Sequence, residues 1–103
     1  MPIHNKLVRD RIPEIIEKSG KKASCYTLNE DEYIKELDKK LNEECAEYQA
    51  DKSIEELADM LEVIYAITEA RGYTVAELEK VRAGKAEKRG SFKNRIYLKK
   101  VDG

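Results

Sequence analysis

Residues 43–67, EECAEYQADKSIEELADMLEVIYAI, decide the fold, because two stretches with helical spacing of apolar residues flank a short polar break. Each stretch carries two acids three residues apart, first Glu44 and Glu47, then Glu56 and Asp59. At about 100° per residue, all four acids lean toward the apolar side of their helices, and Glu44 lies deepest in the apolar stripe. The pattern therefore predicts a helical pair with carboxylates at its interior face.

Neighbouring acids show the opposite placement. Glu55, Glu62 and Glu69 gather on one solvent-facing arc, and Glu43 is predicted on the outer face of its helix. Ionised carboxylates in an apolar interior are costly unless they are paired, protonated or bound to a metal. The four inward acids therefore predict a cation site, and oxygen ligands suit Mg²⁺, or else Mn²⁺. The competing interpretation is ordinary solvated acids, because 40% of the residues are charged.

The whole chain predicts an all-α fold, a small bundle of three to four helices. A short helix is expected over 13–18, followed by capped helices over 30–50, 54–71 and 75–88. Asn29, Ser53 and Thr74 each precede a glutamate by three residues, which is the capping-box pattern. The glutamate after Ser53 is Glu56, so its carboxylate has two candidate roles, one at the cap and one at a metal.

Two segments outside the helices have strand-like composition. Residues 23–28 are rich in β-branched and aromatic side chains, and residues 95–101 partly alternate. They predict a minor two-stranded β element.

Size and composition predict one domain, residues 1–103, whose core is completed by dimerisation. The chain has no Trp and one Phe, and residues 57–67 are apolar over most of the helix circumference. We therefore expect a homodimer or a higher homo-oligomer. The formal net charge of −1 argues against binding a nucleic-acid polymer.

The sequence shows no membrane-spanning run and no signal-peptide pattern, so no membrane association is expected. Cys25 and Cys45 lack metal-ligand spacing and predict free thiols in a cytoplasmic protein, with Cys45 as a small core residue.

Charge is segregated along the chain. Acids dominate residues 30–79, whereas residues 4–22 and 80–100 are basic. In the last helix, Arg82, Lys85 and Arg89 continue the apolar stripe, and Lys93 follows after a glycine. These four bases are candidate phosphate-binding residues. The alternative is that Arg82, Lys85 and Arg89 only stabilise the negative end of their helix and that Lys93 is an exposed strand lysine.

The acidic pattern, with the segment EELADMLEVIYAI, resembles the signature of the MazG-type all-α nucleoside triphosphate pyrophosphohydrolases. The segments NKLVRDRIPEII and KAEKRGSFKNRIYL resemble a branch of small phosphoribosyl-ATP pyrophosphohydrolase-like proteins. The resemblance implies a helical fold that oligomerises, Mg²⁺ held by the four inward acids, and cleavage between the α- and β-phosphates of a nucleotide. It also implies that Lys85 and Arg89 lie at the phosphates.

These observations predict hydrolysis of an NTP or dNTP to the nucleoside monophosphate and pyrophosphate, a house-cleaning activity. Glu44 is the candidate catalytic base for the attacking water. Three alternatives stay open. One is phosphoribosyl-ATP pyrophosphohydrolase activity in histidine biosynthesis, another is a nucleotide sensor without turnover, and the last is a non-catalytic helical interaction module.

Overall fold

The computed structural model describes residues 3–103. All the regular secondary structure in this part of the chain is α-helical. The four helices are α1 (Ile12–Lys18), α2 (Glu30–Ala50), α3 (Ile54–Ala70) and α4 (Val75–Arg89). The predicted all-α class is therefore confirmed. None of these helices combines the length and the apolar character that a bilayer crossing requires.

Local signals account for the helix boundaries. Asn29 and Thr74 each accept a hydrogen bond from the backbone of the glutamate three residues later, and that glutamate's carboxylate accepts one in return from the cap N–H. These two predicted capping boxes are confirmed. Gly72 and Gly90 follow the ends of α3 and α4 with φ near +89° and +85°, a conformation that costs glycine little.

Only one of the two hydrogen bonds of the capping box predicted at Ser53 forms. The Ser53 hydroxyl accepts a hydrogen bond from the Glu56 N–H at 3.3 Å, but the Glu56 side chain does not return to the backbone N–H of Ser53. The Glu56 carboxylate is thus free for a role elsewhere.

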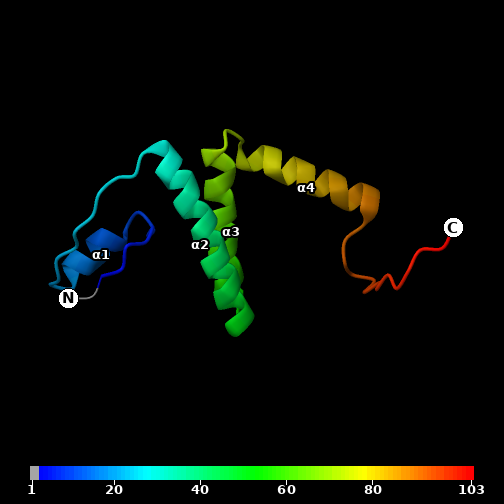
Figure 1. Ribbon diagram of the computed structural model, residues 1–103, viewed down its shortest axis with the longest axis horizontal. Helices are drawn as coiled ribbons and strands as arrows, with labels where there is room; N and C mark the ends of the chain where they lie inside the picture. The colour runs from blue at the N-terminus through cyan, green and yellow to red at the C-terminus, as the bar shows by residue number, and fades with distance from the viewer. Residues whose placement is uncertain (1–2) are drawn as a thin grey trace.

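The predicted β element is wrong, because residues 3–103 contain no strand. Residues 23–28 link α1 to α2, whereas residues 95–101 follow α4 on the other side of the molecule (Figure 1). A strand needs a neighbour to receive its backbone hydrogen bonds. With no partner segment close by, the strand-like composition of these two segments does not produce a sheet.

The helices α2 and α3 form an antiparallel pair joined by a tight turn, and α4 leaves this pair at the end of α3 (Figure 1). The core of the pair is small. Leu37 from α2 and Val63 from α3 are the buried apolar residues in the described chain. Cys45, predicted in the core, is exposed, since the other described residues leave that side of α2 uncovered. Both cysteines are free, as predicted.

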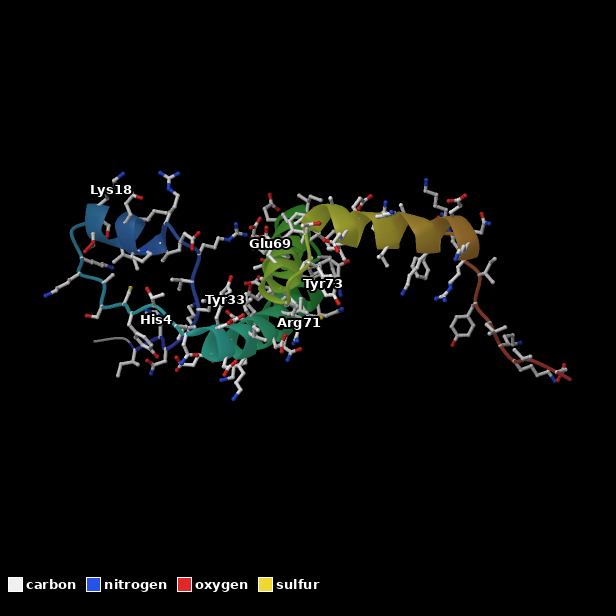
Figure 2. All side chains as sticks on the ribbon, turned by 90° about the horizontal axis from the view of Figure 1, so that it is seen from above. His4, Lys18, Tyr33, Glu69, Arg71 and Tyr73 are labelled. Atoms are coloured by element: carbon white, nitrogen blue, oxygen red, sulfur yellow. The ribbon has the colours of Figure 1, made fainter. Side chains whose placement is uncertain are left out.

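The single chain is extended for its size. Its radius of gyration is 18.3 Å, compared with about 13 Å for a compact domain of this length. Side chains from α4 onward project into open space (Figure 2), and Phe92, Ile96 and Tyr97 are each more than four-fifths exposed. One chain therefore leaves a large apolar surface uncovered.

Candidate functional site

The inward acids predicted from the helical spacing meet between α2 and α3. Carboxylate oxygens of Glu44, Glu56 and Asp59 lie within 4.8 Å of one another. A second group with the same spacing joins Glu44 to Glu47 and Glu43. Glu44 is common to both groups. The antiparallel pairing of α2 and α3 produces this convergence, because it sets the last turns of α2 against the first turns of α3.

Glu44 is the most buried polar residue of the described chain, with 7% of its surface exposed. Its Oε1 lies 3.6 Å from Lys40 Nζ, whereas its buried Oε2 has no hydrogen-bond partner among the described residues. The buried Oε2 of Glu56 likewise has no partner in that part of the chain. Buried carboxylate oxygens are normally satisfied, so these two orphans indicate a missing positive or donating group.

The pKa shifts within the cluster also indicate a site for a cation among the acids. Burial raises the pKa of Glu44 above its ordinary value, and repulsion from Glu47 raises this pKa further, against the lowering effect of Lys40. Burial likewise raises the pKa of Glu56, reinforced by the charges of Glu47 and Asp59. Carboxylates that repel one another in this way are stabilised as anions when a cation lies among them.

The residues fit a hard divalent cation. Such ions prefer several carboxylate oxygens, and here three carboxylates from two helices converge around unsatisfied oxygens. Glu44, Glu56 and Asp59 would hold the ion, and Glu47, which is exposed beside Glu44, would support it from the rim.

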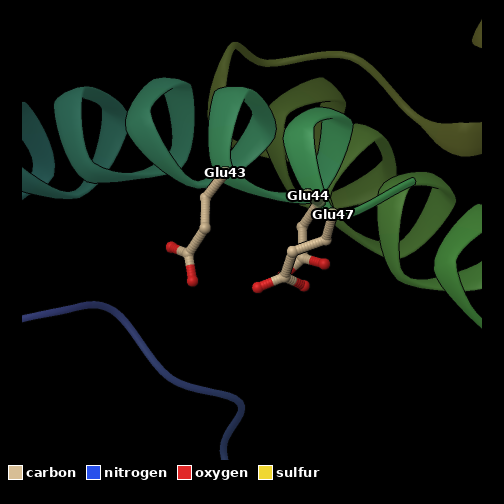
Figure 3. A group of neighbouring side chains, drawn as sticks. All are labelled: Glu43, Glu44 and Glu47. Carbon is tan, nitrogen blue, oxygen red and sulfur yellow. The ribbon is translucent and has the colours of Figure 1, made fainter. Parts of the chain in front are cut away.

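Glu43 departs from its predicted place on the outer face. It is half-buried, lies beside Glu44 and Glu47, and pairs with Lys40 at 3.4 Å. Figure 3 shows the three glutamates projecting to the same side of α2. The side-chain reach of glutamate, together with the attraction of Lys40, brings its carboxylate round to the cluster. By contrast, Glu55, Glu62 and Glu69 are exposed, as predicted.

The predicted phosphate-binding bases do not meet the acids within one chain. Arg82, Lys85, Arg89 and Lys93 are all exposed, and none lines a cavity beside Glu44. Arg82 instead binds Glu79 through Nε at 2.9 Å, which raises the pKa of the guanidinium and lowers that of Glu79. The direction of α4, away from the α2–α3 pair, causes this separation (Figure 1).

Three other cations, none of them predicted as site residues, lie at the acids. Arg9 donates a hydrogen bond to Asp59, and Lys6 and Lys40 line the same cavity as Glu44. Lys40 could have been found from its position four residues before Glu44. For Lys6 and Arg9 the signals were the basic character of residues 4–22 and the family resemblance of the segment NKLVRDRIPEII, and neither says where that segment lies.

Among known proteins, an uncharacterized protein of Mycolicibacterium smegmatis (strain ATCC 700084 / mc(2)155) is 56% identical to this chain over 45 residues. Those residues are 44% of this chain and 46% of that protein, so the match spans about half the length of the relative. No described protein family and no solved structure matches the chain. Membership of the MazG-type superfamily therefore stays a prediction that rests on the sequence motifs.

Proposed function

We propose that this protein is a nucleotide pyrophosphohydrolase of the MazG type, which hydrolyses an NTP or dNTP to the monophosphate and pyrophosphate. The observation that supports this most directly is the carboxylate cluster with the orphaned oxygens of Glu44 and Glu56. A bound Mg²⁺ would neutralise phosphate oxygens and supply an activated water. The proposed reaction needs both of these.

The side chains of the cluster have separate roles in the proposed reaction. Glu56 and Asp59 hold the cation from α3. Glu44 would hold it from α2, and its carboxylate, whose buried Oε2 is unpaired within residues 3–103, accepts the proton of the attacking water. Lys85 and Arg89 neutralise the leaving pyrophosphate.

The position of α4 limits how Lys85 and Arg89 can reach the leaving pyrophosphate. Since Lys85 and Arg89 lie away from the acids of their own chain, they can meet a phosphate held at the acids only if a second copy brings its α4 there. We therefore include a homodimer in the proposal, as the exposed apolar surface also suggests.

The substrate test is pyrophosphate release from every common NTP and dNTP, and from phosphoribosyl-ATP, with Mg²⁺ present. Release from one or more nucleotides supports the proposal, and release from phosphoribosyl-ATP alone selects the histidine-pathway activity. Nucleotide binding without release identifies a sensor. Absence of both nucleotide binding and Mg²⁺ binding in calorimetry identifies an interaction module.

The metal test compares E44Q, E47Q, E56Q and D59N with E55Q, an exposed acid on the same helix as Glu56. E44Q, E56Q and D59N should weaken Mg²⁺ binding by more than the roughly 10–100-fold that loss of an outer-shell partner costs, and E47Q should weaken it by about that amount, because Glu47 lies at the rim. E55Q should bind and turn over like the unaltered protein. E43Q is expected to have an intermediate effect, because Glu43 reaches the rim of the cluster. Loss of activity in E55Q together with full activity in E44Q would refute the assignment.

A further inference from the structure

The N-terminal segment, residues 3–11, brings positive charge to the acid cluster. Arg9 donates from Nη2 to Asp59 Oδ1 at 2.6 Å, although fifty positions separate the two residues in the sequence. A cavity of about 250 Å³ adjoins this contact. Its charged lining consists of Lys6, Arg9, Lys40, Glu44 and Asp59. Three cations therefore face two carboxylates across one small cavity.

The ion pair alone does not explain this arrangement. The side chains of Arg9 and Asp59 are 58% and 40% exposed, and a solvated pair of this kind adds little to stability. A guanidinium has five N–H donors, and within residues 3–103 Asp59 is its one side-chain partner. Lys6 has no carboxylate within ion-pair distance in the same part of the chain. Several N–H donors of Arg9 and Lys6 at the cavity wall therefore have no side-chain acceptor within residues 3–103.

The charge balance indicates what these donors bind. The orphaned Oε2 of Glu44, on a residue with 93% of its surface buried, points to a cation among the acids. With a cation bound to Glu44 and Asp59, Lys6 and Arg9 have no other carboxylate partner among residues 3–103, whereas Lys40 keeps Glu43. An anion that carries several oxygens would then satisfy Lys6 and Arg9.

We propose that Arg9 and Lys6 are phosphate-binding residues, and that Arg9 exchanges Asp59 for a phosphate oxygen when a polyphosphate enters with its cation. This inference rests on the proposed function and deepens it, because it assigns a phosphate subsite to the N-terminal segment of the chain that carries the acids. The ligand class is the pyrophosphate group of a nucleotide bound together with a divalent cation.

Calorimetry on the full chain tests this assignment with two probes, MgCl₂ alone and inorganic pyrophosphate at saturating Mg²⁺. R9Q and K6Q should each raise the Kd for pyrophosphate by about tenfold or more, the effect of losing one hydrogen bond to a charged group. The Kd for Mg²⁺ alone should stay unchanged in K6Q, and in R9Q it should stay unchanged or fall, since Arg9 competes for Asp59. R9K should recover part of the pyrophosphate affinity.

The matched control is R71Q. Arg71, labelled in Figure 2, also pairs with an aspartate of another element, Asp38, at 3.4 Å, but neither residue lines the cavity. R71Q should therefore leave both affinities unchanged. Pyrophosphate affinity unchanged in both R9Q and K6Q would overturn the inference, even if R9Q melts at a lower temperature. If R9Q fails to fold, K6Q still decides, because Lys6 makes no ion pair within residues 3–103 that its loss could break.

Nucleotide hydrolysis measured on the same variants separates this inference from the proposed function. Turnover in the unaltered protein, with unchanged KM and pyrophosphate affinity in R9Q and K6Q, overturns the inference alone. Pyrophosphate binding that depends on Arg9, without hydrolysis of any nucleotide, supports the inference and overturns the proposed function. A protein that binds neither Mg²⁺ nor pyrophosphate overturns both.

Discussion

Replacement of Leu61 by glutamate should abolish the proposed homodimer, because this leucine lies on an apolar face of α3 that the rest of residues 3–103 leaves about half exposed. Leu61 is 46% exposed, and Leu57, one turn earlier on the same side, is 45% exposed. The buried Val63 shows that a different face of α3 packs on α2. The side that carries the two leucines is therefore available to a second copy.

The surface area gives the size of the expected interface. The chain exposes 9610 Å², whereas a compact monomer of 11.9 kDa exposes about 5,900 Å². The excess is about 3,700 Å² per chain, or about 7,400 Å² for two copies, and it exceeds the roughly 2,000 Å², counted over both partners, at which obligate interfaces begin. A two-fold interface contains each residue twice, so L61E would bury two uncompensated charges, each costing about 3–5 kcal/mol. A total of about 6–10 kcal/mol would raise the dimer Kd by at least about 10⁴-fold.

Light scattering coupled to size-exclusion chromatography, at micromolar concentration, measures this directly. The unaltered protein should have at least twice the mass of the chain, and L61E should be a monomer or fail to fold. N42E adds the same charge at an exposed position of α2 and should keep the mass of the unaltered protein. A clean monomer for the unaltered protein, or an intact dimer for L61E, would refute the reasoning.

Three further predictions concern the bases of α4, the carboxylate of Glu44 and the cap of α3. If Lys85 and Arg89 neutralise the leaving group, K85A and R89A should each lower kcat/KM by roughly 10²-fold and leave the Mg²⁺ affinity unchanged. Intact turnover with a lower, salt-sensitive melting temperature would show that these bases only stabilise the helix end. Without metal, E44Q should melt higher than the unaltered protein near pH 7 and lose this advantage as the pH falls. In the folded state the pKa of Glu44, whose neighbours are Glu47, Asp59 and Lys40, is raised. The folded unaltered protein therefore binds a proton at Glu44 more tightly than the unfolded chain does. Its free energy of unfolding rises as the pH falls through that raised pKa. A pH-independent difference in melting temperature would contradict this. Finally, S53A should destabilise α3 by about 1 kcal/mol in denaturant unfolding and leave Mg²⁺ binding intact, because Ser53 caps the helix while the Glu56 carboxylate is not part of the cap.

Interactions between residues close in the chain made much of this protein predictable from its sequence. Helix caps act within four residues, so the positions of Asn29 and Thr74 were enough to locate two helix starts. Helical periodicity is also local, and it placed Glu44 among apolar side chains and Glu55 in solvent. The meeting of the inward acids follows from the same periodicity wherever α2 and α3 are neighbours.

Only the tertiary structure decided what depends on contacts between distant segments. The two strand-like segments have no sheet because the chain keeps them apart, and α4 carries its bases away from the acids for the same reason. The local sequence allowed the Glu56 carboxylate either to complete the helix cap or to join the acid cluster, and the tertiary structure places it in the cluster. Arg9 meets Asp59 across fifty positions of sequence, and no local pattern encodes a contact of that range.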